Sequence, residues 1–244
     1  MSNDHFRFKQ FSVFQSSCAM KVGFDACLLG SWAPSPPNAT RMLDIGTGTG
    51  VLALMLAQRF PSATLTAIDI DHDSVRQASE NVAISAFRSR VSVLHSAFEL
   101  FARSAIRSGT LFHAIVSNPP YFQPSTQSLL ASDPQRAVAR HDSDGLLRQI
   151  FTLTPRLLTP DGILSLILPA ELQSHALSLA NSLNLISCVS VFTSPRRQSP
   201  KRILLSFSLA PSAPSFSRLD VRNADGSFSS DYSRLLSPFY LHLS

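Results

Sequence analysis

Short apolar runs alternate with longer segments of helical period from residue 41 onward. Apolar runs at residues 41–45, 65–70, 91–94, 112–117, 163–168, 186–192 and 203–209 predict seven strands. Between them, residues 51–59, 74–86, 98–106, 146–157 and 171–183 carry apolar positions three and four apart, which predicts helices. We expect Asp73 and Ser74 to cap the second helix, and Asp161-Gly162 to form a tight turn before the fifth strand.

This alternation is typical of βαβ units and predicts a mostly parallel sheet. The segment 193–202 is too short to hold a crossover helix, so the last two strands must be antiparallel. The predicted topology resembles that of class I methyltransferases. The expected fold is therefore α/β and Rossmann-like, with a seven-stranded, mostly parallel sheet that ends in an antiparallel hairpin.

The chain is predicted to be a single domain over residues 1–244 with three parts. Residues 1–40 form an N-terminal lid or arm, 41–210 a Rossmann-like core, and 211–244 a C-terminal extension rich in serine and proline. The link Pro34-Ser35-Pro36-Pro37 marks the first boundary, because consecutive prolines fit neither a helix interior nor a central strand.

Composition narrows the class of protein. With 44% hydrophobic and 15% charged residues in 244, the chain can bury a large core, which excludes a disordered protein. The N-terminus lacks a secretion signal and no stretch reaches the ~18 apolar residues of a membrane span, so we expect a cytoplasmic protein without membrane contact. The three cysteines lie in no metal-ligand spacing, so we expect reduced thiols and no metal. We also expect a monomer.

A glycine-rich turn follows the first strand of the core. Gly46, Gly48 and Gly50 alternate with other residues, so the backbone can turn sharply and approach a ligand at the start of a helix. Asp69 ends the next strand, where a carboxylate can accept both hydroxyls of a ribose. The alternatives are a plain structural turn, a helix-capping role for Asp69, and an NAD site.

Together, these residues resemble the cofactor site of S-adenosylmethionine-dependent methyltransferases. The resemblance implies that Asp44 faces the ammonium group of S-adenosyl-L-methionine and that Ser96, Ala97 and Phe98 flank its adenine. The candidate cofactor residues of the core are Asp44, Gly46, Thr47, Gly48, Gly50, Asp69, Ile70, Ser96, Ala97 and Phe98.

A second motif, Asn118-Pro119-Pro120-Tyr121, follows the fourth predicted strand. Two prolines fix φ and remove two N–H donors, which leaves a rigid loop of hydrogen-bond acceptors. Asn118 adds a side-chain carbonyl, and Tyr121 adds a ring on which a planar group can stack.

This motif resembles the (N/D)PP(Y/F) signature of methyltransferases that act on planar nitrogens. The resemblance implies a catalytic role for Asn118, Pro119, Pro120 and Tyr121. Acceptors that hold both hydrogens of an amine direct its lone pair at the methyl donor, and Asn118 and the Pro119 carbonyl are the expected acceptors. The substrate could be an adenine amine, a guanine amine of rRNA or a glutamine amide of a protein.

The N-terminal arm narrows this choice. Residues 8–13 and 18–32 resemble the family that N6-methylates an adenine beside the anticodon of tRNA(Val). The resemblance covers nearly the whole chain and implies a tRNA substrate. It also implies that Lys21, Gly23 and Asp25 close over the methionine end of the cofactor, although Phe24-Asp25-Ala26 stands where a Thr-Asp-Gly run is expected.

Basic segments fit an RNA partner. The net charge is +5, and Arg196, Arg197, Lys201 and Arg202 form a basic loop between the last two strands. A second basic group, Arg136, Arg140 and His141, follows the Asn-Pro-Pro-Tyr motif. Both groups could equally be solvated surface. An RNA-binding module with a vestigial cofactor fold and a nicotinamide-dependent oxidoreductase remain the alternatives outside methyltransferases.

Overall fold

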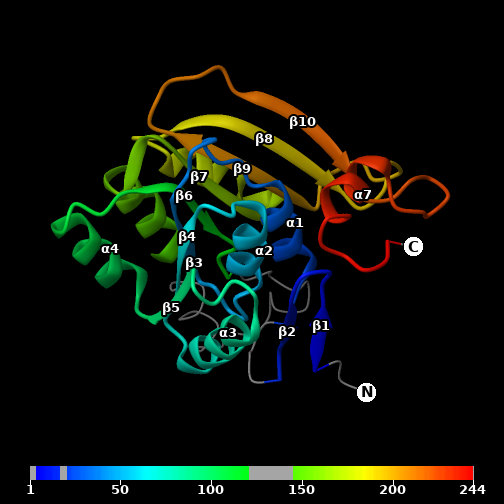
Figure 1. Ribbon diagram of the computed structural model, residues 1–244. Coiled ribbons are helices and arrows are strands. Elements are labelled where there is room, and N and C mark those ends of the chain that lie inside the picture. Colours follow the sequence, from blue (N-terminus) through cyan, green and yellow to red (C-terminus); the bar gives the residue numbers. More distant parts are fainter. Residues whose placement is uncertain (1–3, 17–20, 121–144, 244) are drawn as a thin grey trace, which may run out of the picture.

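The computed structural model describes residues 4–16, 21–120 and 145–243 (Figure 1). The strands of its main sheet are β3 (Arg41–Ile45), β4 (Thr64–Asp69), β5 (Val91–His95), β6 (Phe112–Ser117), β7 (Leu158–Pro169), β8 (Asn184–Phe192), β9 (Arg202–Ser208) and β10 (Ser215–Asp220). They lie in the order β10-β8-β9-β7-β6-β3-β4-β5. All neighbours are parallel except that β9 runs antiparallel to both β7 and β8.

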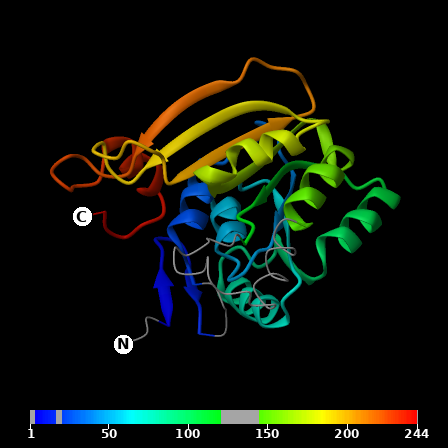
Figure 2. The same cartoon turned by 180° about the vertical axis from the view of Figure 1, so that it is seen from behind.

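Helices cover both faces of this sheet, as Figures 1 and 2 show from opposite sides. The helices are α1 (Phe24–Trp32), α2 (Val51–Arg59), α3 (His72–Ile84), α4 (Phe98–Arg107), one that covers residues 145–153, α6 (Gln173–Leu179) and α7 (Ser230–Leu236). Helices α1, α2 and α3 pack on one face, while α4, the 145–153 helix and α6 pack on the other. Within the described ranges, no helix is long and apolar enough to cross a membrane.

The alternation of side chains along each strand builds the two layers. Met42 of β3 packs into the cluster of α1 and α2, whereas Leu43 packs into the cluster of α4. Successive residues of a strand point to opposite faces, so a strand covered on both sides is apolar at nearly every position. This is why the sequence shows continuous apolar runs, and the predicted α/β Rossmann-like fold is confirmed.

The sheet has one strand more than predicted. β10 adds an eighth strand at the edge, parallel to β8. Its sequence gives little sign of this, because only Leu219 of its six residues is buried and Phe216 is 68% exposed. An edge strand with one covered position lacks the apolar pattern that marks the other seven.

One local prediction is wrong, and a second is right about an irregularity but wrong about its place relative to the strand. Asp71, rather than Asp73 or Ser74, caps α3, because its carboxylate accepts the backbone N–H of Ser74 at 2.8 Å. The expected turn at Asp161-Gly162 lies inside β7, which begins at Leu158. A Cβ atom on Gly162 would lie 2.9 Å from the carbonyl oxygen of Phe112, so the glycine permits a close approach of two strands.

The two ends of the chain pack together. The N-terminal arm forms a hairpin of β1 (His5–Arg7) and β2 (Ser12–Phe14). Phe8 is buried and bridges Tyr240, and the backbone N–H of Lys9 donates to the carbonyl of Phe239 at 2.8 Å. One apolar cluster contains Phe8, Leu54 and Phe239, from the arm, core and extension. This shared cluster favours the single-domain organisation, which stays a prediction.

Candidate active site

The ends of four parallel strands meet in register at one edge of the sheet. Ile45 of β3 lies opposite Ile68 of β4 and opposite Ser117 of β6, whose hydroxyl donates to the Ile45 carbonyl at 2.8 Å. The chain runs outward from β3 through β4 to β5 and then returns to β6 on the other side of β3. This reversal is the topological switch point where open α/β sheets bind ligands.

The glycine-rich loop leaves β3 at this point. Gly46, Gly48 and Gly50 have φ angles of 73°, 56° and 81°, which residues with side chains rarely adopt. The N–H groups of Gly46 and Thr47 both donate to the carbonyl of Ile68, at 2.9 and 3.0 Å. The sharp turn predicted from the alternating glycines is therefore present, and it is fixed against the end of β4.

Asp69 holds the same loop from the side. Its carboxylate accepts the N–H of Gly48 at 2.8 Å and that of Asp71 at 3.0 Å. Its own carbonyl accepts the N–H of Ser96 at 2.9 Å, which brings the end of β5 alongside. Asp69 does not cap α3, since Asp71 has that position, and it retains lone pairs for a hydroxyl partner.

Two predicted cofactor residues near Asp69, Ile70 and Phe98, differ in the exposure of their side chains. Ile70 is 71% exposed, so its side chain is open to a ligand. Phe98 is 5% exposed and packs into the cluster beneath α4, so its side chain cannot face an adenine and only its backbone could.

Asp44 is completely buried beneath the glycine loop. The Thr47 hydroxyl donates to Asp44 Oδ2 at 2.6 Å, whereas Asp44 Oδ1 has no hydrogen-bond partner within the described part of the chain. Burial raises the pKa of the Asp44 carboxyl to about 7, although the Thr47 hydrogen bond opposes this shift. A cation next to Oδ1 would stabilise the charged form.

A cavity of about 710 Å³ opens beside the glycine loop, a size typical of small-molecule sites. The predicted site residues that line this cavity are Lys21, Gly23, Asp25, Gly46, Thr47, Gly48, Asn118, Pro119 and Pro120. The other predicted cofactor residues lie beneath or beside the loop, outside the cavity: Asp44, Gly50, Asp69, Ile70, Ser96, Ala97 and Phe98. Tyr121 lies outside the described residues, as do Arg136, Arg140 and His141.

Asn118 carries the second open acceptor of the site. Its Oδ1 atom is buried and has no hydrogen-bond partner in the described ranges. A buried amide oxygen without a donor is costly in free energy unless a ligand supplies one. Asn118 lines the cavity together with Gly46, so the Asn-Pro-Pro motif and the glycine loop border the same space.

An ion pair holds the arm against the cavity. Arg202 Nε lies 2.8 Å from Asp25 Oδ2, and the two side chains are only 13% and 16% exposed. Asp25 lies in the first turn of α1 and Arg202 begins β9, so the pair fixes the start of α1 at the cavity wall. The sequence indicates a basic loop that contains Arg202 and could bind RNA, but it gives no sign of the pairing with Asp25.

Part of the remaining wall comes from residues that the sequence analysis did not include in the site. They belong to β8, to the connection after it, and to the C-terminal extension: Val191, Thr193, Val221, Arg222, Phe228 and Tyr232. The Asp225-Gly226 turn signal was visible in the sequence, but nothing in the sequence placed the flanking residues Arg222 and Phe228 at the same cavity as the Asn-Pro-Pro motif.

Comparison with known proteins decides the family. The family model "Methyltransferase small domain" matches residues 26–191. The tRNA1(Val) (adenine(37)-N6)-methyltransferases of Aeromonas hydrophila and Bacteroides thetaiotaomicron are each 39% identical to this chain, over 99% and 100% of both chains respectively. The chain belongs to the tRNA1(Val) (adenine(37)-N6)-methyltransferase family.

A solved structure supports the fold of this family member. A predicted O-methyltransferase from Agrobacterium tumefaciens superposes with a TM-score of 0.70 at 20% identity, over 88% of this chain and 96% of the other. At this identity the match supports the fold alone.

The residues present fit the expected cofactor, S-adenosyl-L-methionine. The unpartnered Asp44 Oδ1 suits an ammonium group, and the lone pairs of Asp69 suit ribose hydroxyls. No cluster of three or more His, Cys, Asp or Glu side chains able to hold a metal occurs within the described ranges.

The Asp69→Ala variant is expected to bind S-adenosyl-L-methionine about 10- to 100-fold more weakly. The change removes a charged acceptor for hydroxyl groups and also releases the N–H of Gly48, so the glycine loop loses a contact. Titration calorimetry measures the dissociation constant. Asp73→Ala is the matched control, since Asp73 is an exposed carboxylate on α3 paired with Arg76. Equal affinities for the two variants would contradict the assignment of Asp69.

Proposed function

We propose that this protein transfers a methyl group from S-adenosyl-L-methionine to the exocyclic N6 amine of adenine 37 in a valine tRNA. The relatives that match over their whole length carry this activity in their names. The open Asn118 acceptor in the cavity supports the same reaction, because an amine would supply the missing donors.

The cofactor supplies an electrophilic methyl group on a positively charged sulfur. The nitrogen of an adenine amine is a weak nucleophile, because its lone pair is delocalised into the ring. Asn118 Oδ1 accepts one amine hydrogen, and the adjacent Pro119 carbonyl is the expected acceptor for the other. Held in this way, the nitrogen becomes more pyramidal and its lone pair points along one direction. Formation of the carbon–nitrogen bond would break the methyl–sulfur bond, whose electron pair would neutralise the sulfur, and the nitrogen would then release one proton to solvent.

Positioning supplies most of this catalysis. Proline has no backbone N–H, so no donor from Pro119 or Pro120 competes with the amine hydrogens for the acceptors of the loop. The target adenine must leave its stack to reach the cavity, and an unpaired anticodon-loop base does so at lower free-energy cost than a paired one.

The decisive experiment uses labelled S-adenosyl-L-methionine and bulk tRNA from cells that lack the modification. After incubation, the tRNA is digested to nucleosides, which are identified by mass spectrometry. The expected product is N6-methyladenosine, and oligonucleotide mapping should place it at position 37 of a valine tRNA. A methylated guanine, or label transferred only to protein glutamine, would contradict the proposal.

The setting of the reaction follows from its substrate. Mature tRNA is abundant in the cytoplasm, so we expect the enzyme to act there. The monomeric state remains a prediction, which light scattering of the purified protein tests.

A further inference from the structure

The loop after β10 returns on itself as a small hairpin at the mouth of the cavity. Arg222 and Phe228 form an isolated antiparallel bridge, so their side chains emerge opposite each other. The N–H of Asn223 donates to the carbonyl of Ser227 at 2.8 Å, and Gly226 makes the turn with a φ of 91°. Both Arg222 and Phe228 line the cavity that contains Asn118.

A continuous stack of planar groups extends from this hairpin to α1. The Arg222 guanidinium lies 4.3 Å from the centre of the Phe228 ring. Phe228 stacks on Tyr232, with ring centres 5.0 Å apart, and Tyr232 stacks on Phe24 of α1 at 5.9 Å. Tyr232 is buried, whereas Arg222 is exposed. The exposed Arg222 guanidinium is thus one end of the stack.

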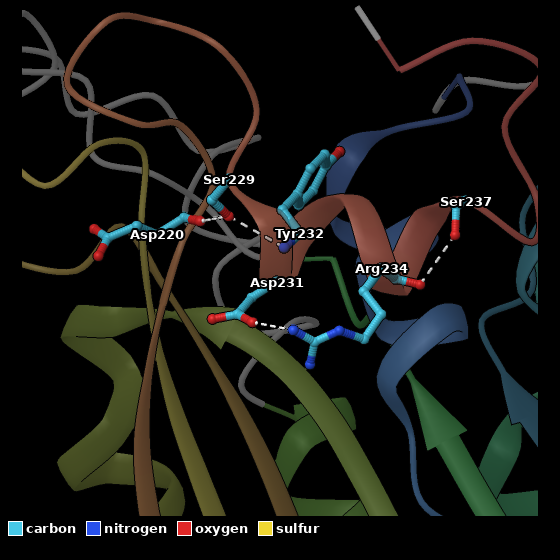
Figure 3. A network of polar contacts seen from close by, with 6 residues as sticks. All are labelled: Asp220, Ser229, Asp231, Tyr232, Arg234 and Ser237. Atoms are coloured by element: carbon cyan, nitrogen blue, oxygen red, sulfur yellow. Dashed lines mark hydrogen bonds and ion pairs between the residues drawn. The ribbon is translucent and has the colours of Figure 1, made fainter.

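The stack rests on a fixed helix end. Ser229 caps α7: its hydroxyl oxygen accepts the N–H of Tyr232 at 3.1 Å and donates to the carbonyl of Asp220 (Figure 3). In Figure 3 the ring of Tyr232 projects from the first turn of α7. Arg196 ties the hairpin to the β8–β9 connection by donating to the carbonyl of Ala224 at 3.1 Å. A platform held in this way loses little entropy when a ligand binds.

The charges around the platform favour a polyanion. The cations among the described residues that line the cavity are Lys21, Lys201, Arg202 and Arg222. The acidic one is Asp25, which is paired with Arg202. A cavity that contains a stacking surface and excess positive charge matches the two chemical parts of a nucleotide, its flat base and its phosphate.

We propose that Arg222 and Phe228 form a subsite for a nucleotide adjacent to the methylated adenine. The base of that nucleotide stacks on the exposed Arg222 guanidinium while the target base enters the cavity toward Asn118. Unpaired RNA bases commonly stack on arginine planes and aromatic rings, which makes an anticodon-loop neighbour the fitting ligand. The inference rests on the proposed RNA substrate and assigns the C-terminal extension a part in recognising it.

The test is a cycle between protein and RNA variants. Anticodon stem-loop RNA is prepared intact and with an abasic site on either side of the target adenine, and binding is followed by fluorescence anisotropy. Arg222→Ala is expected to weaken binding of intact RNA about tenfold. One of the two abasic RNAs should weaken binding to the wild-type protein equally. Arg222→Ala should then cause no further loss with that RNA, because the same contact is already gone.

Two further variants identify the contact. Arg222→Lys keeps the charge but loses the plane, and it should bind as weakly as Arg222→Ala. Arg218→Ala is the matched control, since Arg218 lies on the same segment, stacks on Phe192 and does not line the cavity. It should bind RNA nearly as the wild type does. All variants should keep the wild-type affinity for S-adenosyl-L-methionine.

Three results would overturn the subsite: unchanged RNA binding by Arg222→Ala, wild-type binding by Arg222→Lys, or losses that multiply when the abasic RNA and Arg222→Ala are combined. Because the cycle measures binding, it is decided independently of methylation. If the wild-type protein binds the RNA as described but methylates no adenine, the proposed function fails while the subsite stands.

Discussion

The Asn118→Ala variant is expected to lower kcat by about 10²- to 10³-fold, the usual loss when one preorganised polar group is removed from a reacting centre. Asn118 lines the cavity, and its Oδ1 atom is buried with no protein donor in the described ranges, so an amine hydrogen is its expected partner. Without the Asn118 acceptor, the lone pair of the amine nitrogen is no longer directed at the methyl group. Single-turnover methylation of tRNA measures the effect directly.

Two comparisons separate chemistry from folding. Asn118→Asp retains an acceptor at the same place and should lose less activity than Asn118→Ala. Asn181→Ala removes an exposed asparagine that does not line the cavity and should leave the rate unchanged. The affinity for S-adenosyl-L-methionine should be the same in all of them. An Asn118→Ala enzyme with a wild-type rate would disprove the role of this side chain.

The Asp44→Asn variant should lose about 10²-fold in affinity for S-adenosyl-L-methionine, because the buried carboxylate that would face the ammonium group becomes neutral. The substitution keeps the shape and the acceptor for the Thr47 hydroxyl. Its effect on the stability of the cofactor-free protein should depend on pH.

The sign of that dependence follows from the pKa of Asp44, which burial raises from 3.8 to about 7 in the folded protein. The folded state therefore holds a proton that the unfolded state has released, so stability from this group is lost as pH rises toward 7. Between about pH 5 and about pH 8, the melting temperature of the wild-type protein should fall more than that of Asp44→Asn. If the melting temperatures of the two proteins changed equally with pH, this pKa and its cause would be contradicted.

The central part of the site could be predicted because each feature has a local signature. Strands buried on both faces leave continuous apolar runs, as in β3 and β6, and these runs locate the residues that follow them. Gly46, Gly48 and Gly50 occupy backbone conformations that glycine adopts at low cost, so their spacing alone indicates the turn. Asn118 was predicted from the same logic, as the first residue after a buried strand.

The outer wall could not be predicted because it depends on contacts between distant segments. The Asp25–Arg202 pair joins residues 177 positions apart, and no sequence feature near either residue indicates the contact. The Arg222–Phe228 bridge is local, but its position beside the cavity depends on β10, an edge strand with a single buried side chain. The burial of the Phe98 side chain could not be predicted for a related reason, since an aromatic residue that opens a helix can serve the core as well as a ligand.

The pairing of Phe8 with Tyr240 and of Lys9 with Phe239 has a consequence for biosynthesis. Domains fold during synthesis as their segments leave the ribosome. The ring of Phe8, next to the first hairpin, can be buried only after residues 239 and 240 have been synthesised. The cavity residues Arg222, Phe228 and Tyr232 are synthesised shortly before them. A nascent chain therefore has no finished cavity, and a product truncated by premature termination would be inactive as well as unstable.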